Sequence, residues 1–313
     1  LFEKTFGGSY EDGAGFNAVV NFNDTAYILG GDIRYSNGMT DAYIVVCDTN
    51  GNETTHYIWG GSSYDMAYDL IKTSDNNLLF AGRTWSYGAG WFDGWAYKFT
   101  PSGTMLWSKT YGGTGKEHFY RVAETLYDSG FVYTGGNNYD YFWIVKADKN
   151  GNQLWEKSFG LGSGTDICSF PDRTIIAGGT RSYGPNPSTV NVYLVALTPA
   201  GDTLYTRYWG GSQEDAVYGI CPTPDNGYIV TGHTMSMGAG GADILLQKYS
   251  LDGTLLWTKI YGGTGNEYSY KLEPTSDNCY LVAGNTSSIG AGSGDVWLLK
   301  IDQNGDTIWT ATY

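Results

Sequence analysis

The chain has 313 residues, of which 41% are hydrophobic, 16% aromatic and 16% charged, and 46 are glycine. Its formal net charge of −14, from 32 acidic and 18 basic residues, excludes the basic surface that a nucleic-acid-binding protein needs. No apolar run approaches the roughly 18 residues of a membrane-spanning helix.

One aromatic motif recurs along the whole chain. Its last residue falls at Phe6, Trp59, Tyr111, Phe159, Trp209, Tyr261 and Tyr313, at spacings of 53, 52, 48, 50, 52 and 52 residues. A second column lies four residues earlier, at Phe2, Thr55, Trp107, Trp155, Tyr205, Trp257 and Trp309. The sequence therefore contains six full repeats and one extra copy of the motif.

In chain order we expect a strand at 1–6 and then six repeats of four strands each, at 7–59, 60–111, 112–159, 160–209, 210–261 and 262–313. The last repeat is typical. YSYKLEP is its first strand, CYLVAGNT its second, DVWLLKID its third and DTIWTATY its fourth. The Asn-Gly turn before the fourth strand is a strong hairpin signal. No helical periodicity is present.

Four antiparallel strands repeated every 40 to 50 residues are typical of propeller blades. The sequence therefore predicts a single all-β domain over 1–313, a six-bladed β-propeller of four-stranded antiparallel blades, with residues 1–6 as a surplus outer-type strand. A β-solenoid is the alternative fold, although its repeats are usually shorter.

The repeat consensus, GG[ST]xxD…GxTxSxGAGxxDxW…DxxGxxxWxKxYGG, resembles that of the secreted prokaryotic β-propeller repeat proteins over the whole chain. The resemblance implies a propeller fold and a secreted, extracellular or cell-surface location, but it names no ligand. Residue 1 is Leu, with no charged and apolar leader after it, so we expect a mature product or a fragment. Repeat four departs from the consensus, with Gly160-Leu161 for Gly-Gly and Asn191 for the usual Asp.

Seven copies of the outer strand compete for six positions. Either the last repeat keeps its own fourth strand and residues 1–6 are surplus, or residues 1–6 close the last blade and the C-terminal strand is displaced. An unpaired apolar strand can pair with a neighbouring subunit and build a filament or array. The expected interface residues are Leu1, Phe2, Phe6, Trp309 and Tyr313. The alternatives are a fifth strand on its own blade, or a chain cut from a longer array.

An acidic residue follows each inter-repeat loop, at Asp12, Asp65, Glu117, Asp166, Asp215 and Glu267. Six acids at the mouth of a central channel are candidate ligands for a hard cation such as calcium. The regular recurrence favours a structural role, in which each carboxylate accepts hydrogen bonds from glycine N–H groups. We therefore expect no cofactor, with structural calcium as the alternative. The Asp48 and Asp302 segments, DTNGN and DQNGD, are interpreted as hairpin turns rather than calcium loops.

Aromatic residues near the glycine-rich loops are candidates for stacking on a sugar ring. They are Trp85, Tyr87, Trp91, Tyr139 and Tyr141. The structural interpretation, which we favour, is that they cover the ends of the sheets.

No catalytic constellation is evident. The three histidines, His56, His118 and His233, lie on different repeats, no GxSxG motif occurs and the six arginines are dispersed. Hydrolysis by paired carboxylates stays open, because spatial pairing is invisible in the sequence. The cysteines, Cys47, Cys168, Cys221 and Cys279, form no CxxC pair and are expected to be small buried residues, although Cys168 and Cys221 occupy equivalent repeat positions.

Three glycosylation sequons begin at Asn23, Asn52 and Asn285. Together these features predict a non-enzymatic extracellular structural or adhesive propeller that self-associates through a terminal strand. The alternative is a carbohydrate-binding module or glycan-active enzyme. The expected partners are further copies of the chain and a glycan, not nucleic acid.

Overall fold

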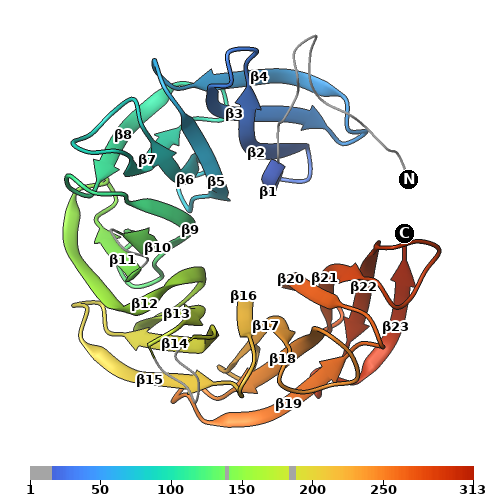
Figure 1. Ribbon diagram of the computed structural model, residues 1–313. Helices are drawn as coiled ribbons and strands as arrows, with labels where there is room; N and C mark the ends of the chain where they lie inside the picture. The colour runs from blue at the N-terminus through green and yellow to red at the C-terminus, as the bar shows by residue number, and fades with distance from the viewer. Residues whose placement is uncertain (1–15, 138–140, 183–187) are drawn as a thin grey trace. The chain divides into compact units, whose positions relative to one another are not determined.

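The computed structural model describes residues 16–137, 141–182 and 188–313 (Figure 1). Five of the residues singled out above, Leu1, Phe2, Phe6, Asp12 and Tyr139, lie outside these ranges. The chain divides into two compact units, Leu1–Lys157 and Ser158–Tyr313.

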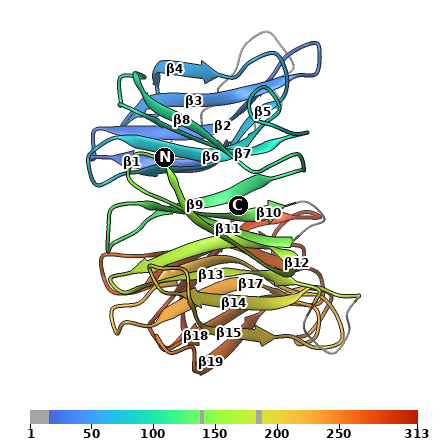
Figure 2. The same cartoon turned by 90° about the vertical axis from the view of Figure 1, so that its left-hand side faces the viewer.

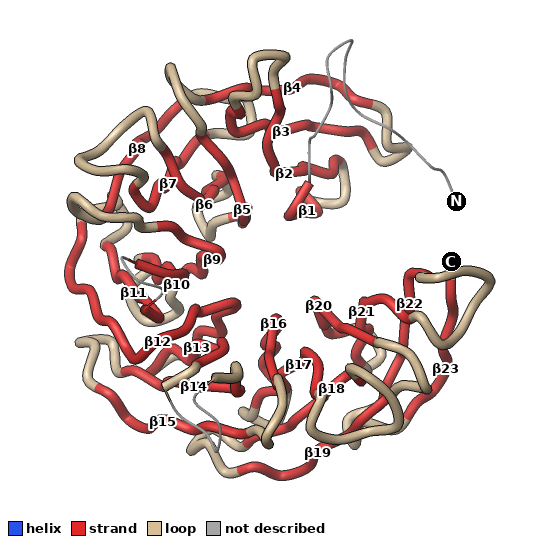
Figure 3. Tube along the Cα trace, viewed as in Figure 1, coloured by secondary structure: helices blue, strands red, loops and turns tan. Residues whose placement is uncertain are grey.

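Every regular element in the described residues is a β-strand (Figure 3). Short strands with alternating side chains, joined by Asn-Gly and Asp-Gly turns, favour antiparallel hairpins over helices. Within the same ranges no helix has the length and apolar character to cross a membrane.

The first unit contains two four-stranded antiparallel sheets, in which neighbours in sequence are neighbours in space. One sheet consists of β1 (Phe16–Phe22), β2 (Ala26–Arg34), β3 (Thr40–Asp48) and β4 (Glu53–Trp59). The other consists of β5 (Asp65–Lys72), β6 (Leu78–Thr84), β7 (Asp93–Phe99) and β8 (Met105–Tyr111).

The second unit contains two sheets of the same order. The first comprises β16 (Asp215–Pro222), β17 (Tyr228–Thr234), β18 (Asp243–Tyr249) and β19 (Leu255–Tyr261). The second comprises β20 (Glu267–Pro274), β21 (Tyr280–Thr286), β22 (Asp295–Ile301) and β23 (Thr307–Thr312).

The third and fourth repeats form one seven-stranded sheet instead of two separate sheets. Its order is β15-β14-β13-β12-β11-β10-β9, and Figure 2 shows β13, β14 and β15 running side by side. The strands are β9 (His118–Glu124), β10 (Phe131–Asn137), β11 (Tyr141–Ala147), β12 (Gln153–Phe170), β13 (Arg173–Thr180), β14 (Asn191–Leu197) and β15 (Thr203–Trp209).

The 18-residue strand β12 explains this difference from the prediction. It combines the outer strand of repeat three with the inner strand of repeat four. Gly162 pairs with Thr180, at the position where Asp65 pairs with Thr84 in repeat two. Repeat four therefore lacks the carboxylate that fixes the turn elsewhere, and the chain continues as a strand. The all-β antiparallel prediction is confirmed, whereas six separate four-stranded sheets are not observed.

The last repeat keeps its own outer strand. β23 pairs with β22 from Trp297↔Thr312 to Ile301↔Thr307. Of the two arrangements expected for the terminal strands, the described residues therefore show the one in which the C-terminal strand is not displaced.

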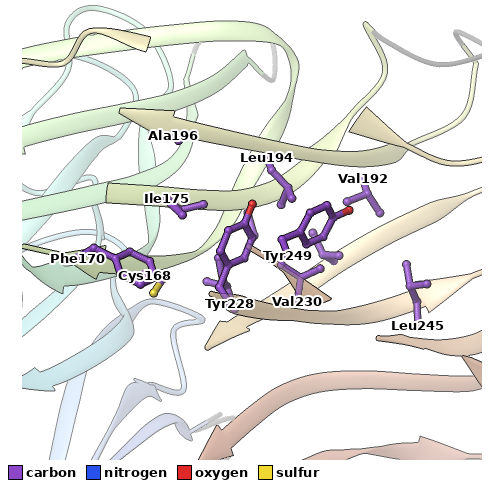
Figure 4. Close-up of a cluster of buried hydrophobic side chains, with 13 residues drawn as sticks. Cys168, Phe170, Ile175, Val192, Leu194, Ala196, Tyr228, Val230, Leu245 and Tyr249 are labelled. Carbon is purple, nitrogen blue, oxygen red and sulfur yellow. The ribbon is translucent and has the colours of Figure 1, made fainter. Parts of the chain in front are cut away.

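The cores lie between facing sheets. In the first unit Ile28, Ala42 and Ile44 pack against Phe80 and Phe99 of the next sheet. In the second unit a cluster that includes Tyr228 and Tyr249 occupies the corresponding position (Figure 4). Burying one such large side chain stabilises the fold by about 1.5–3 kcal/mol, so these faces hold neighbouring sheets together.

The hairpin turns follow the sequence prediction. Gly51 adopts a φ of 76°, which favours glycine, and its N–H donates to the Asp48 carbonyl at 3.0 Å. The Asp48 carboxylate accepts from the N–H groups of Asn50 (2.9 Å) and Asn52 (2.8 Å). Asp302 accepts in the same way from the N–H groups of Asn304 and Asp306. Both carboxylates therefore cap their own turns.

Candidate ligand-binding site

A cavity of about 540 Å³ lies in the first unit, where β4 approaches β7 and β8 of the next sheet. Figure 1 shows these three strands and the long loop between β6 and β7. The residues that define the cavity are Trp59, Gly60, Tyr87, Trp95, Tyr97 and Ser108. Ile58 and Met105 form its exposed apolar rim.

Four aromatic rings form the walls. The Trp59 ring lies 4.7 Å from Tyr97, and the Tyr87 ring lies 6.0 Å from Trp95, measured between centroids. Trp95 and Tyr97 are buried at the base, whereas Tyr87 is 47% exposed and lies at the entrance. The cavity therefore lies between Trp59 of one sheet and Trp95 and Tyr97 of the next.

The polar groups of the cavity are neutral. The Tyr87 hydroxyl donates to the Gly60 carbonyl at 2.7 Å, and Trp95 Nε1 donates to Ser108 Oγ at 2.9 Å. Partial burial, and then the charges of Asp65 and Asp41, raise the pKa of the Tyr87 phenol. The hydroxyl is therefore a neutral hydrogen-bonding group at physiological pH. This arrangement can bind by ring stacking and hydrogen bonding.

The structure separates the predicted sugar-stacking residues. Tyr87 lines the cavity, but Trp85 packs on Phe92 at 4.4 Å and does not. Trp91 is 69% exposed, with Lys116 Nζ 5.1 Å from its ring. Tyr141, in β11, is half-exposed and belongs to another sheet.

Sequence reasoning missed three of the four rings, Trp59, Trp95 and Tyr97. One signal was available for Tyr97. The corresponding third-strand position holds an aliphatic residue or glutamine in every other repeat, at Val45, Val145, Val195, Gln247 and Leu299. An aromatic residue in this column is thus specific to repeat two.

The acids after the inter-repeat loops bind loop backbone. Asp65 Oδ2 accepts from Gly61 N–H at 2.8 Å, and Asp215 Oδ2 accepts from Gly211 N–H at 2.7 Å. Glu267 accepts from Gly263 N–H at 2.7 Å, and Glu117 accepts more weakly from Gly113 N–H at 3.3 Å. Each carboxylate lies at its own inter-repeat loop. In the part of the chain that the structure describes, no three His, Cys, Asp or Glu residues are grouped for a metal.

Asp166 does not belong to this series, contrary to the prediction. It pairs with Ala177, as Asp69 pairs with Ala81, so it lies in the middle of an inner strand. Its Oδ2 accepts from Ile220 N–H at 3.0 Å and from Lys271 Nζ at 3.1 Å. The prediction was wrong because β12 runs through the position where the other repeats have their loop.

The remaining candidates are dispersed. Trp309 and Tyr313 are exposed on the last sheet, and the side chains of Asn23, Asn52 and Asn285 are exposed. Cys47, Cys168 and Cys221 are buried free thiols, and Cys279 is a partly buried one.

The histidines lie apart. His56 Nδ1 lies 2.7 Å from Glu53 Oε1 on an exposed strand. His233 is fully buried in another sheet, and this burial lowers its pKa.

Comparison with solved structures shows the fold. No family model matches this sequence, and no curated protein matches it. The chain is similar to the Neurospora crassa Pan2 WD40 domain, with a TM-score of 0.59 and 11% identity over 93% of this chain and 76% of that one. It is also similar to Chaetomium thermophilum Sqt1, with a TM-score of 0.57 and 13% identity over 96% and 73% of the two chains.

A third similar structure is the Synechocystis apocarotenoid oxygenase, with a TM-score of 0.54 and 10% identity over 95% of this chain and 71% of that one. At such low identity these likenesses carry the fold and not the function. The chain thus has an all-β propeller fold.

Proposed function

We propose that this protein is a non-enzymatic extracellular adhesive propeller that binds a glycan in the aromatic cavity of its first unit. The observation that carries this proposal is the convergence of the partly exposed Trp59 and Tyr87 rings on one cavity of about 540 Å³, with the buried rings of Trp95 and Tyr97 beneath it. Trp and Tyr rings present flat apolar faces to the C–H faces of a sugar ring. The neighbouring neutral hydroxyl and carbonyl groups suit its hydroxyl groups.

The size of the cavity fits a short saccharide, since small-molecule pockets usually measure about 300–1,000 Å³. A disaccharide has about 23 non-hydrogen atoms, and at about 0.3 kcal/mol per atom it gains about 7 kcal/mol, which corresponds to a Kd of about 10 μM. Such modest affinity suits adhesion, in which many weak contacts act together.

The proposal includes six blades, with β12 supplying the outer strand of the third and the inner strand of the fourth. The equivalent pairings of repeats two and four, such as Asp69↔Ala81 and Asp166↔Ala177, support it. Extracellular location is supported by the repeat resemblance and by the exposed sequons at Asn23, Asn52 and Asn285.

The test is a glycan-array screen followed by calorimetry on each hit. We expect Tyr87→Ala and Trp59→Ala to weaken binding at least tenfold. The matched control is Met237→Ala, at the position equivalent to Tyr87 in the second unit, and it should leave binding unchanged. No hit on the array, or equal affinities for all variants, would refute the proposal. Release of new reducing ends from a bound glycan would favour the glycan-active enzyme instead.

One observation favours head-to-tail self-association as a second function. Val296 is 54% exposed, whereas the equivalent Ile244 and Val192 are fully buried under the next sheet. Trp309 and Tyr313 extend the same exposed apolar region. Negative-stain microscopy of the intact chain, of a chain lacking residues 1–6 and of Val296→Lys tests this. Filaments from the intact chain alone support it, and single particles from all three contradict it.

A further inference from the structure

Pairs of polar side chains meet at the first glycine after an outer strand. A Cβ on Gly262 would overlap Asp243 Oδ1 and lie 2.6 Å from Glu267 Oε2, so both carboxylates lie against the same Cα. Glycine is required here because the two acids occupy its side-chain space. The pairs are Asp41 with Asp65 at Gly60, Asp93 with Glu117 at Gly112, Asp243 with Glu267 at Gly262, and Asn191 with Asp215 at Gly210.

The two members of a pair are not hydrogen-bonded equally. Glu267 accepts from Gly263 N–H at 2.7 Å, Thr286 Oγ1 at 2.9 Å and Ser288 N–H at 3.1 Å. Burial opposes its ionisation, but these donors lower the pKa of Glu267. Burial, and then the Glu267 charge, raise the pKa of Asp243, against the opposing effect of the Ala239 N–H at 3.0 Å. The ionised form therefore belongs to Glu267, and Asp243 is the member that takes a proton.

The Asp41 pair of the first unit repeats this asymmetry. Asp41 Oδ1 is buried and has no hydrogen-bond partner, while Tyr35 donates to its Oδ2 at 2.8 Å. Burial raises the pKa of Asp41 and of Asp93, and burial and then the Asp93 charge also raise the pKa of Glu117. Other titratable groups also face these pairs. They are the Tyr35 and Tyr87 phenols at the Asp41 pair and Glu156 at the Glu117 pair.

The fourth pair contains a neutral analogue. Asn191 occupies the position of Asp41, Asp93 and Asp243, and it is fully buried. Its Oδ1 has no hydrogen-bond partner and lies against Gly210 beside Asp215 Oδ2. Its Nδ2 donates to the Thr189 carbonyl at 3.3 Å, so a neutral amide stands beside the Asp215 carboxylate. The substitution thus occurs at the member that takes the proton in the Asp41 and Asp243 pairs.

We propose that each of the other three pairs holds one shared proton. Asp41 and Asp243 are neutral carboxylic acids that donate a hydrogen bond to Asp65 and Glu267, respectively, and Asp93 and Glu117 hold one proton between their two carboxylates. Two carboxylates held this close cannot both ionise at low cost, which is the general reason for such sharing. A divalent cation between the carboxylates is the competing occupant, and the test below separates the two.

The consequence is a stability that falls as the pH rises. Unfolded Asp releases its proton near pH 4, whereas the folded pairs keep theirs, so the folded state binds more protons above that pH. For each proton that the folded state retains, the equilibrium constant for folding falls tenfold per pH unit, until the folded acid itself ionises.

The experiment is a reciprocal exchange in the second unit, Asp243→Asn and Asn191→Asp. Urea unfolding is followed by tryptophan fluorescence from about pH 5 to about pH 9. We expect Asp243→Asn to reduce the pH dependence of the unfolding equilibrium constant by up to a factor of ten per pH unit. Asn191→Asp should increase it by the same factor. Asp202→Asn, on an exposed turn, is the matched control and should leave the dependence unchanged.

Two outcomes would overturn the proposal. One is an unchanged pH dependence in Asp243→Asn. The other is stabilisation of the native chain by calcium chloride, reversed by EDTA and absent in Asp243→Asn, which would make the occupant a cation. If Asn191→Asp does not fold, infrared spectroscopy of the native chain decides. Loss of a protonated-carboxyl stretch in Asp243→Asn supports the proposal, and absence of that stretch from the native chain refutes it.

Discussion

Two sheet interfaces of this protein use the same repeat positions for different purposes. In the first unit, the interface between β1–β4 and β5–β8 contains the aromatic cavity. In the second unit, β13–β15 face β16–β19, and Trp209 occupies the position of Trp59. There Leu245 replaces Trp95, Gln247 replaces Tyr97 and Met237 replaces Tyr87.

The second interface is organised around a tyrosine pair. Tyr228 and Tyr249, which lie side by side in Figure 4, stack with their ring centroids 5.3 Å apart. The Tyr249 hydroxyl donates to Gln247 Oε1 at 2.9 Å. The backbone pairings of the two interfaces are equivalent. The repeat scaffold is therefore constant, and a few side chains on the third strand and the loop before it determine whether an interface contains a cavity.

The largest effect should come from a feature that both interfaces share. Gly82 and Gly232 lie opposite a bulge in the inner strand, and a Cβ on either would overlap the carbonyl of Met66 or Ala216. Because backbone cannot move aside, Gly82→Ala and Gly232→Ala should each lower the free energy of unfolding by about 5 kcal/mol. Urea unfolding measures this. Gly113→Ala, which meets nothing within 4 Å, is the control. A loss under about 1 kcal/mol would show that the bulge is not rigid.

The next effect should distinguish the interfaces. Trp59 contacts the rings of Tyr97 at 4.7 Å and Phe99 at 4.6 Å, whereas Trp209 packs on the cluster around Val230 and Leu245. Trp59→Ala should cost about 4 kcal/mol and Trp209→Ala about 3 kcal/mol, because ring pairs add to burial. The same unfolding assay measures both. Equal losses would mean that the aromatic cavity adds nothing to the stability of its interface.

Much of the fold could be predicted because each repeat carries its own turn chemistry. The Asn50-Gly51 turn and the alternating third strand are local signals, and local signals are visible in one sequence. The fusion of two strands into β12 was not visible. The strands fuse because no carboxylate follows Gly160 to hold a turn, as Asp65 does in repeat two. The absence of a residue is not a motif that can be recognised in one sequence.

The cavity was harder to predict for a different reason. Trp59 and Tyr97 are 38 residues apart and belong to different sheets, so their meeting depends on how two faces pack. Tyr87 was identified because it lies in a long glycine-rich loop, and ligands usually bind at long loops. Trp85 and Trp91 share that signal but point elsewhere, since a loop sequence does not determine which way its rings point.

A smaller effect should be equal in the two units. Asp75 and Asp225 each pair with a lysine at 2.7 Å, Lys98 and Lys248. Partial burial opposes ionisation of Asp75, but hydrogen bonds from Lys98, Thr73 and Asn77 lower its pKa to about 2. Its stabilising contribution is therefore complete above about pH 4 and is lost as the pH falls through about 2.

Since both carboxylates are more than half exposed, solvent weakens these pairs. Asp75→Asn and Asp225→Asn should each cost about 1 kcal/mol at pH 7. The difference from the native chain should shrink in acid. Urea unfolding at pH 7 and near the folded pKa of Asp75, about 2, measures this difference. A loss of stability that stays constant with pH would show that the charge is not responsible.

The smallest effect compares a permanent cation with a titratable one. Arg83 and His233 occupy the same second-strand position, and both contact a tyrosine from the inner strand, Tyr68 or Tyr218. The Arg83 guanidinium lies 4.7 Å from the Trp85 ring and stays charged. His233 is enclosed instead, and burial lowers its pKa although the Glu214 charge opposes the shift.

Because the folded pKa of His233 lies below the unfolded value of about 6.5, its neutral form stabilises the fold above that pH. This contribution is lost as the pH falls from about 6.5 towards the folded pKa, the reverse of the trend expected for the shared carboxyl protons. His233→Gln should remove the loss, with a smaller total effect than the other variants because Glu214 Oε1, 3.5 Å away, partly compensates the charge. Arg83→Gln should change stability equally at all these pH values. Unfolding midpoints between about pH 5 and about pH 7 measure both. If His233→Gln keeps the native acid sensitivity, the histidine does not act as a titratable counterpart of Arg83, and the two interfaces differ only in packing.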